Sequence, residues 1–284
     1  MDLFALQALN AIVGNAFDAA ALEWALGGGS IRFDGECFFS IGGARAQASL
    51  GGKPVPPFTT CFAEAGAELV IERFTGGRFL YVALGGGIDV PVVMGSRSTY
   101  LPGHFGGMGG RMITRDDSLS LGERSASSPA PGFNCQAELL PHYDSQVVRI
   151  VRGTHGDLFN DAQWTVLGNQ RFAISSSSDR TGYRLKGPAI ENALGNLPSD
   201  PGCYGAIQIP TDGAPIVLMA DAPTVGGYPK IAVVIDADLP ILAQGSPGES
   251  VQFELVTIEQ SQRALRKRAA DLRTIRSSGA ASAS

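Results

Sequence analysis

The stretch QIPTDGAPIVLMADAPTVGGYPKIAVVI, residues 208–235, holds the pattern on which the fold assignment depends. Two short apolar runs, Ile216–Met219 and Ile231–Val234, are separated by a segment that carries prolines, an aspartate and paired glycines. Short runs rich in β-branched residues and bounded by such turn residues are typical of strands. The stretch therefore predicts two strands joined by a loop, with Asp221 just after the first strand.

Similar runs occur along most of the chain. The 284 residues include 37 Gly and 17 Pro, and this enrichment favours tight turns between short strands. We expect Thr75–Gly77 to form a hairpin turn between strands at Glu68–Phe74 and Phe79–Leu84. Many short strands between turns fit a barrel or sandwich better than a parallel α/β sheet. The other expected strands are Leu22–Leu26, Ile31–Phe33, Cys37–Ile41, Val147–Val151, Gln163–Leu167, Arg171–Ser175, Gly205–Ile209 and Val251–Val256.

Helical periodicity is found near the two ends of the chain. Apolar residues from Leu3 to Val13 recur at helical spacing, and Gly14-Asn15 gives a stop; a second helix is expected at about Ile258–Ile275. The segment ERSASSPAPGFN, residues 123–134, has the small, polar and proline residues of a linker. We therefore expect an N-terminal β region at 1–122, a C-terminal β region at 135–276 and a flexible tail at 277–284.

Composition excludes several classes of protein. The net charge of −5 and pI of about 5.2 argue against a nucleic-acid surface. The basic cluster from Arg263 to Arg276 is read as a solvated helix face, with a polyanion site as the alternative. No apolar run reaches the roughly 18 residues of a membrane span, and no signal-peptide pattern opens the chain. The four cysteines contain no C-x-x-C pair, so we expect a cytoplasmic protein with reduced thiols.

The strongest single candidate for chemistry is Asp221. It follows the apolar run Pro215–Ala220 and precedes a Gly-Gly-Tyr-Pro turn in which Tyr228 could face the same cavity. A carboxylate at a strand end beside glycines is well placed to orient or deprotonate a small polar ligand. The alternative is that Asp221 caps a turn through Thr224.

A glycine-rich loop is the second candidate. Residues 84–94, LGGGIDVPVVM, lack the Lys-Ser/Thr ending of a P-loop, so a tight turn between strands is favoured over a phosphate site. The following GSRST, residues 95–99, brings Ser96, Ser98 and Thr99 together with an arginine. These groups could hold a carboxylate or phosphate, or could form a surface turn with local hydrogen bonds.

A third segment, SSSSDRTGYRLKG at 175–187, combines charges of both signs. Arg180 and Arg184 could bind an acidic substrate, or could belong to a structural ion-pair turn with Asp179. The three histidines have no zinc spacing, and no GxSxG or SxxK nucleophile signature is present. We therefore expect no metal site and no self-contained hydrolytic triad.

Four blocks, in this order along the chain, resemble the allophanate hydrolase subunit 2 family. This family is similar to half of a biotin-dependent carboxyltransferase. The blocks are GGGIDVPVVMGSRST at 85–99, GGMGGR at 106–111, the segment 175–187 and the stretch 208–235. The shorter VGN, ALE and LGGG, at 13–15, 21–23 and 26–29, agree as well. The family includes a region of urea amidolyase, a bacterial antagonist of a sporulation-kinase inhibitor, and the C subunit of 5-oxoprolinase, to which the chain is most similar. The resemblance implies a mainly β fold of two cyclophilin-like β-barrel regions, with a few short helices, a C-terminal helix and a ligand cavity between the barrels.

The same resemblance implies roles for particular residues. The catalytic residues, which would bind or polarise a small amide substrate, are Asp221, Gln208 and Tyr228. The substrate's carboxylate or a phosphorylated intermediate would be held by Arg180 and Arg184. Further contacts would come from the facing loop, through Ser96, Ser98 and Thr99, and from the first helix, through Asn15. Family members normally begin about two dozen residues earlier with a TTVQD-x-GR-x-G motif, so we expect either a late start or a missing first strand, which would leave a sheet edge unpaired.

Three functions remain open at this point. The first is a component of ATP-dependent 5-oxoprolinase that is inactive alone and works with a subunit 1-like protein (the B subunit) and a LamB/YcsF-type protein (the A subunit). The second is the carboxyltransferase half of a biotin-dependent urea or amide carboxylase, with biotin on a separate carrier. The third is a non-catalytic protein that binds a subunit 1-like kinase inhibitor. One scaffold serves all three, because fold does not fix function.

Overall fold

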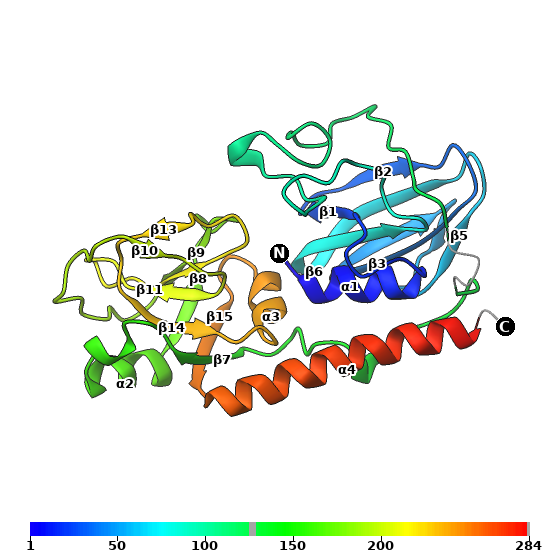
Figure 1. The fold of residues 1–284 in the computed structure, drawn as a ribbon. Helices are drawn as coiled ribbons and strands as arrows, with labels where there is room; N and C mark the ends of the chain where they lie inside the picture. Colours follow the sequence, from blue (N-terminus) through cyan, green and yellow to red (C-terminus); the bar gives the residue numbers. More distant parts are fainter. Residues whose placement is uncertain (125–128, 283–284) are drawn as a thin grey trace. The chain divides into compact units, whose positions relative to one another are not determined.

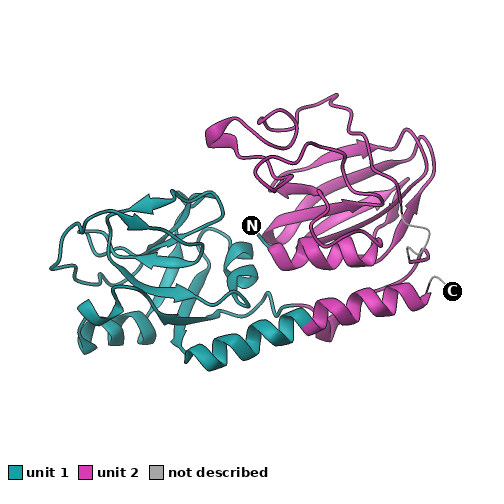
Figure 2. Cartoon of the chain, viewed as in Figure 1, with its two compact units in different colours: residues 1–2, 141–269 teal, residues 3–140, 270–284 magenta. Residues whose placement is uncertain are grey.

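The computed structural model describes residues 1–124 and 129–282 (Figure 1). The chain divides into two compact units (Figure 2). The barrel unit contains residues 1–2 and 141–269, and the sheet unit contains residues 3–140 and 270–284. The long C-terminal helix α4, Ile258–Ser282, contributes its first part to the barrel unit and its last part to the sheet unit.

The barrel unit is built on a closed barrel with the strand order β11-β12-β9-β8-β15-β7-β14. All neighbours are antiparallel except β15 and β7, which run parallel. A two-stranded ribbon of β10 and β13 is hydrogen bonded separately. The bounds are β7 Val147–Arg152, β8 Arg171–Ile174, β9 Gly182–Lys186, β10 Asp200–Pro201, β11 Ala206–Gln208, β12 Ile216–Leu218, β13 Val225–Gly226, β14 Lys230–Val234 and β15 Ser250–Leu255.

Alternating side chains fill the barrel. On neighbouring strands Tyr183, Val217 and Ile207 lie opposite one another, and all three are fully buried. Since successive side chains of a strand point to opposite faces, their sequence neighbours face outward. Gln208 therefore lies on the outer face of the barrel wall.

Tyr183 brings a polar atom into this inner layer. Its hydroxyl donates to the Ala243 carbonyl at 2.8 Å, near the end of helix α3, Leu239–Gln244. Tyr183→Phe leaves that buried carbonyl without its partner, so we expect the free energy of unfolding to fall by about 1–2 kcal/mol. Urea denaturation measures the change. A loss equal to that of Tyr100→Phe, whose hydroxyl has no hydrogen bond to another described residue, would show that the Ala243 contact is unimportant.

One expected strand of this unit is a helix. Gln163–Leu167 lies inside α2, Asp161–Asn169. The Asn160 side chain accepts from the backbone N–H groups of Ala162 and Gln163, and the Gln163 side chain accepts from the Asn160 N–H, which forms a complete capping box. These caps satisfy the free donors of the first turn and fix the start of the helix, so the strand prediction was wrong.

The sheet unit contains a six-stranded antiparallel sheet. The strand path is β1-β6-β3-β4; β2 also pairs with β6, and β5 also pairs with β3. Helix α1, Leu3–Ile12, packs against β3 and β6. The strands are β1 Leu22–Ala25, β2 Gly29–Arg32, β3 Cys37–Leu50, β4 Lys53–Pro54, β5 Cys61–Ala63 and β6 Glu68–Leu84.

The expected hairpin at Thr75–Gly77 does not form, because β6 runs without a break from Glu68 to Leu84. Its register against β3 shifts around Arg45 and Gly76, which marks a β-bulge. A Cβ on Gly76 would lie 2.5 Å from the Arg45 guanidinium, and Gly77 has a φ of +79°. The glycines therefore serve a bulge inside one long strand and not a reversal of the chain.

The segment expected to be a linker is in part ordered on the sheet unit. Residues 125–128 lie outside the described residues. Beyond them, Thr60 N donates to Phe133 O at 2.8 Å and Gly132 N donates to Thr60 O at 2.7 Å. Helix α4 continues through Ser282, beyond the expected end at Ile275, because Gly279 is buried close to Pro129 and Phe133. The start of the expected tail, from Ser277, is therefore helical.

The mainly β fold with a C-terminal helix is confirmed by this architecture. Among the described residues the other α-helices are the short α1, α2 and α3. Short 3-10 turns occur at Leu101–Gly103, Ala137–Leu139 and Gly156–Leu158.

Candidate functional site

The candidate residues are divided between the two units. Asn15, Ser96, Ser98 and Thr99 belong to the sheet unit. Arg180, Arg184, Gln208, Asp221 and Tyr228 belong to the barrel unit.

Asp221 and Arg180 are bound to each other. Arg180 Nε donates to Asp221 Oδ2 at 2.7 Å, and Nη2 donates to Oδ1 at 3.1 Å. The Asp221 N–H also donates to the Arg180 carbonyl at 2.8 Å. The aspartate side chain is 11% exposed. Because the guanidinium engages both carboxylate oxygens, the geometry favours a structural ion-pair turn for these two residues.

Two other candidates of the barrel unit are exposed. Arg184, on β9, faces outward, and Tyr228 lies just before β14 with 38% of its surface exposed. Asp179, which the sequence suggested as an ion-pair partner, instead accepts from the N–H groups of Thr181 and Gly182. The arginine and the tyrosine are therefore accessible to a ligand.

Gln208, at the end of β11, combines burial with an unused side-chain amide. The residue is 6% exposed, and within residues 1–124 and 129–282 its amide has no hydrogen-bond partner. Its Nε2 lies 3.1 Å from the position that a Cβ on Gly226 would occupy. Buried amides in folded proteins are normally hydrogen bonded, so this group is a candidate to bind a ligand.

The structure adds three residues that the sequence did not single out. Lys230, directly opposite Gln208 on β14, is buried, and its Nζ donates to Asp200 Oδ1. His155 Nε2 lies 3.9 Å from Asp200 Oδ2. The Lys230 ammonium holds the pKa of the Asp200 carboxyl below its usual range. The three side chains form a polar cluster beside Gln208.

A single signal could have pointed to this cluster. Lys230 opens an otherwise apolar strand, KIAVV, and a lysine is rarely buried unless it is paired. Its partners come from distant segments with no motif spacing, so the sequence did not identify Asp200 or His155.

In the sheet unit, the Asn15 side chain ties the end of α1 to the loop after β6. Its Nδ2 donates to Leu84 O at 2.8 Å and to Asn10 Oδ1 at 3.0 Å, and its Oδ1 accepts from Gly86 N at 2.8 Å. These bonds occupy the amide, so the geometry favours a structural role for Asn15.

Asn15→Ala tests this role. We expect it to lower the free energy of unfolding by about 2–4 kcal/mol, since it removes three hydrogen bonds and leaves the Gly86 N–H without its side-chain acceptor. Thermal denaturation of the full chain measures the loss. The control is Gln47→Ala, an exposed amide that, among the described residues, is bonded only to Arg73; the expected change is below about 0.5 kcal/mol. Equal stability of the two variants would exclude the structural role.

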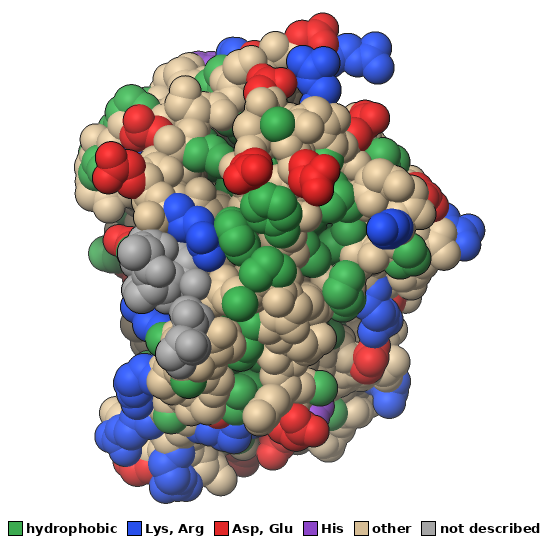
Figure 3. Space-filling view, turned by 90° about the vertical axis from the view of Figure 1, so that its right-hand side faces the viewer, with side chains coloured by type: hydrophobic (Ala, Val, Ile, Leu, Met, Phe, Trp, Pro, Cys, Tyr) green, Lys and Arg blue, Asp and Glu red, His purple; other side chains and the backbone are tan. Residues whose placement is uncertain are grey.

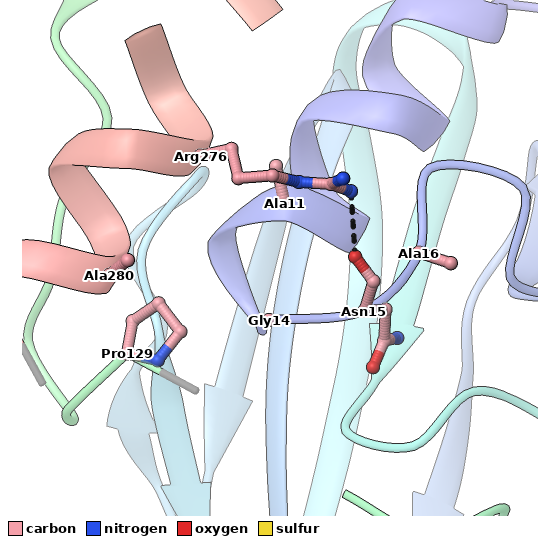
Figure 4. A pocket seen from close by; sticks show the side chains of 7 residues that line it. All are labelled: Ala11, Gly14, Asn15, Ala16, Pro129, Arg276 and Ala280. Carbon is pink, nitrogen blue, oxygen red and sulfur yellow. Dashed lines mark hydrogen bonds between the residues drawn. The ribbon is translucent and has the colours of Figure 1, made fainter. Parts of the chain in front are cut away.

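A pocket of about 330 Å³ lies next to Asn15 (Figure 4). Arg276 reaches toward it from α4, donating to the Asn15 carbonyl at 2.9 Å and stacking on Phe17. The Asn15 side chain points away from this bond toward the loop after β6. The remaining lining residues are Ala11, Gly14, Ala16, Pro129 and Ala280.

The loop from Gly85 to Arg111 holds the hydroxyl candidates. Ser96 and Ser98 are exposed, and Ser96 Oγ accepts from the Ser98 N–H at 3.0 Å, a local turn bond. Thr99 is half-buried, and a Cβ on Gly107 would lie 1.9 Å from its hydroxyl. Arg97 donates to the Val90 carbonyl. The surface-turn interpretation is therefore satisfied here, while the two serine side chains remain accessible.

Neither the surface charge nor the metal-binding side chains of the described residues indicate a further ligand. On the face drawn in Figure 3, acidic and basic side chains are interspersed around hydrophobic ones. Among the described residues, no three His, Cys, Asp or Glu side chains lie close enough together to hold a metal ion. None of the described helices is long and apolar enough to cross a membrane.

Comparison with known proteins gives consistent matches. Residues 1–255 match the family described as carboxyltransferase domain, subdomain A and B. The chain is 35% identical to the C subunit of 5-oxoprolinase from Haemophilus influenzae over 273 residues, 94% of this chain and 85% of that protein. It is 35% identical to the corresponding Escherichia coli protein over 266 residues, 93% of this chain and 84% of that protein. The structure of Kluyveromyces lactis urea carboxylase superposes with a TM-score of 0.88 at 27% identity over 97% of this chain, which spans 26% of that protein.

Proposed function

The chain belongs to the carboxyltransferase domain family, subdomains A and B, and on that premise we propose that it is the C-type component of an ATP-dependent 5-oxoprolinase. The observation that carries the proposal is the 35% identity to two such 5-oxoprolinase components over more than nine-tenths of this chain. Family membership rests on the match of residues 1–255, whereas the substrate and the partners belong to the proposal. A cytoplasmic location goes with it.

The reaction would open 5-oxo-L-proline to L-glutamate. The lactam is a resonance-stabilised amide, so its carbonyl carbon reacts slowly with water. Transfer of the γ-phosphoryl group from ATP to the lactam oxygen would release ADP and activate this carbon. Addition of one water there would break the C–N bond and leave an acyl phosphate, and a second water would hydrolyse the acyl phosphate to the carboxylate and phosphate. This chain would supply a substrate cavity and not a complete active site.

Within the barrel unit, accessibility supports different roles for the candidates. The free amide of Gln208 and the exposed Tyr228 and Arg184 would contact the substrate, with Arg184 holding its carboxylate. Arg180 and Asp221 would hold the turn in place through their ion pair. In the sheet unit, the loop hydroxyls remain candidates for further contacts; they are Ser96, Ser98 and Thr99.

ATP would bind to a partner. The sequence contains no Walker motif, so we place the nucleotide site on a subunit 1-like protein (the B subunit) or on a LamB/YcsF-type protein (the A subunit). In the same way, we expect no activity from this chain alone.

Reconstitution tests the proposal. We expect the purified chain alone to give no ADP with ATP and 5-oxo-L-proline, and the mixture with its two partner subunits to release ADP in proportion to added 5-oxo-L-proline. A coupled ADP assay provides the readout, and the mixture of the two partners without this chain is the control. A complete mixture that does not respond to 5-oxo-L-proline would exclude the assignment.

Carboxyl transfer from carboxybiotin to urea or a related amide is the second candidate. It is favoured by the superposition on urea carboxylase over 97% of this chain. The chain contains no Met-Lys-Met biotin attachment sequence, so biotin would have to arrive on a separate carrier. Activity that requires bicarbonate and such a carrier would replace the first proposal by this one.

A further inference from the structure

We propose that Asp200 and Gln208 form a two-point binding site for the amide group of the substrate. The Asp200 carboxylate accepts the amide N–H, and Gln208 Nε2 donates to the carbonyl oxygen. The choice of ligand, a small lactam or a urea-type amide, rests on the proposed function. The site itself rests on the geometry of the barrel unit.

Asp200 has one oxygen held and the other open. Lys230 Nζ donates to Oδ1, and the lysine side chain is 3% exposed, whereas the aspartate side chain is 33% exposed. His155 Nε2 lies 3.9 Å from Oδ2, too far for a direct hydrogen bond. The carboxylate is therefore held through Oδ1 by a buried lysine, and Oδ2 can accept a hydrogen bond from a ligand.

His155 supports this carboxylate in one tautomer. The Lys230 backbone N–H donates to His155 Nδ1 at 3.1 Å, and a backbone N–H can only donate. In the neutral ring the proton is then on Nε2, which faces Asp200. Lys230 thus donates to the carboxylate, whereas His155 faces it with its Nε2–H across 3.9 Å, and we assign both as positioning residues.

Gln208 provides an independent indication of a ligand. The residue is only 6% exposed, and its amide has no partner among the residues that the structure describes. The amide atoms are not among the fully buried unpaired polar atoms of the described residues, so the amide reaches the surface and can donate to a ligand there. The side chain approaches Gly226, which lies directly opposite Asp200 in the β10–β13 ribbon. Directly opposite residues of an antiparallel pair point to the same face of the ribbon. The Asp200 carboxylate therefore lies on the face of Gly226 that the Gln208 amide approaches.

The two groups match the chemistry of an amide. A lactam presents one N–H donor and one carbonyl acceptor, and the pair presents one strong acceptor and one donor. Because Lys230 lowers the pKa of Asp200, this carboxylate stays ionised and accepts a hydrogen bond without taking the proton. Asp221, the carboxylate expected from the sequence, has both oxygens engaged by Arg180 and is not open in this way.

Paired ligands and variants test the site in the complex with the partner subunits. Calorimetry measures binding of 5-oxo-L-proline and of its N-methyl analogue, which has no N–H to donate. We expect Asp200→Asn to weaken 5-oxo-L-proline about 10- to 100-fold and to change the weaker N-methyl analogue less than twofold. Gln208→Leu should weaken both ligands about tenfold. Asp157→Asn, an exposed aspartate of the same unit, is the matched control and should leave both unchanged.

Gly226→Ala gives a second route that alters no charge. Its Cβ would lie 3.1 Å from Gln208 Nε2 and would narrow the space that the ligand's carbonyl enters. We expect at least a fivefold loss of 5-oxo-L-proline affinity with an unchanged melting temperature. If Asp200→Asn fails to fold, this variant and Gln208→Leu decide the matter.

Lys230→Met tests the positioning role through its pH profile. The charged or titratable groups near the carboxylate are Lys230, His155 and Cys203. Without the ammonium the pKa of Asp200 rises toward its ordinary value, so binding should begin to fail at a higher pH on the acid side than in the wild type. If the role of Lys230 were purely structural, Lys230→Met would weaken binding without changing the pH at which binding begins to fail.

The outcomes separate the two proposals. If the wild-type complex binds 5-oxo-L-proline but Asp200→Asn, Gln208→Leu and Gly226→Ala all bind it within twofold of the wild type, the two-point site is excluded and the proposed function stands. If the wild-type complex binds neither 5-oxo-L-proline nor urea, the proposed function and the site fall together.

Discussion

Replacing Asp2 with Ala is expected to lower the free energy of unfolding of the barrel unit by about 3–5 kcal/mol, because it removes a buried, hydrogen-bonded carboxylate that also interacts electrostatically with Arg268. Asp2 is fully buried, and Gln244 Nε2 donates to its Oδ2 at 3.0 Å. Arg268 lies within electrostatic reach, and burial lowers the pKa of its guanidinium. Burial, together with the Asp2 carboxylate, also raises the pKa of Tyr143 well above its ordinary value.

The cost arises because the donor of this hydrogen bond cannot reach water when the carboxylate is lost: Gln244 is only 3% exposed. Urea denaturation of the full chain measures the change in free energy. Asp34→Ala is the control: its ion pair with Arg32 is 78% exposed on the aspartate side and should change stability by less than about 0.5 kcal/mol. A loss below about 1 kcal/mol for Asp2→Ala would contradict the network.

Asp221→Ala has the second large effect, an expected loss of about 2–4 kcal/mol in the stability of the barrel unit. The bidentate contact with Arg180 is shielded, with side-chain exposures of 11% for the aspartate and 28% for the arginine. Removing the carboxylate takes the bidentate acceptor away from a poorly hydrated guanidinium, which costs more than the pair itself contributes. A double-mutant cycle with Arg180→Met isolates the coupling energy, expected at about 1–3 kcal/mol.

The control cycle uses another Arg–Asp pair of the same unit, Arg152–Asp157. Its Nη1 to Oδ1 distance is 3.4 Å, and the aspartate is 98% exposed, so coupling below about 1 kcal/mol is expected. If Asp221→Asn instead left stability unchanged and abolished turnover in the complex, Asp221 would be a catalytic residue as the family resemblance implied.

The fold class followed from the sequence because strands and turns have local signals. Gly, Pro and Asp punctuate short β-branched runs, and one such run, Ile231–Val234, lies within β14. Local signals failed where two structures share them. A glycine pair serves a hairpin or a bulge equally well, so β6 was divided at Gly76. In α2 the Trp, Thr and Val favour a strand, and the capping box of Asn160 outweighs them.

Only part of the candidate site could be predicted from the sequence. Gln208 and Tyr228 lie in the stretch that decides the fold, and both were chosen from it. Whether a carboxylate is open depends on what the fold places beside it, and nothing local shows that Arg180 engages both oxygens of Asp221. Asp200 becomes a candidate only because the tertiary fold brings the Lys230 ammonium into contact with its carboxylate.

Product analysis of the reconstituted complex tests the central claim most directly. ADP and L-glutamate are measured together after adding ATP and 5-oxo-L-proline, in bicarbonate-free buffer with avidin present to remove biotin carriers. The 5-oxoprolinase account predicts one glutamate for each ADP, with no effect of avidin and none from omitting bicarbonate. ADP release without glutamate, or turnover that stops with avidin and resumes with bicarbonate and a biotin carrier, would contradict it.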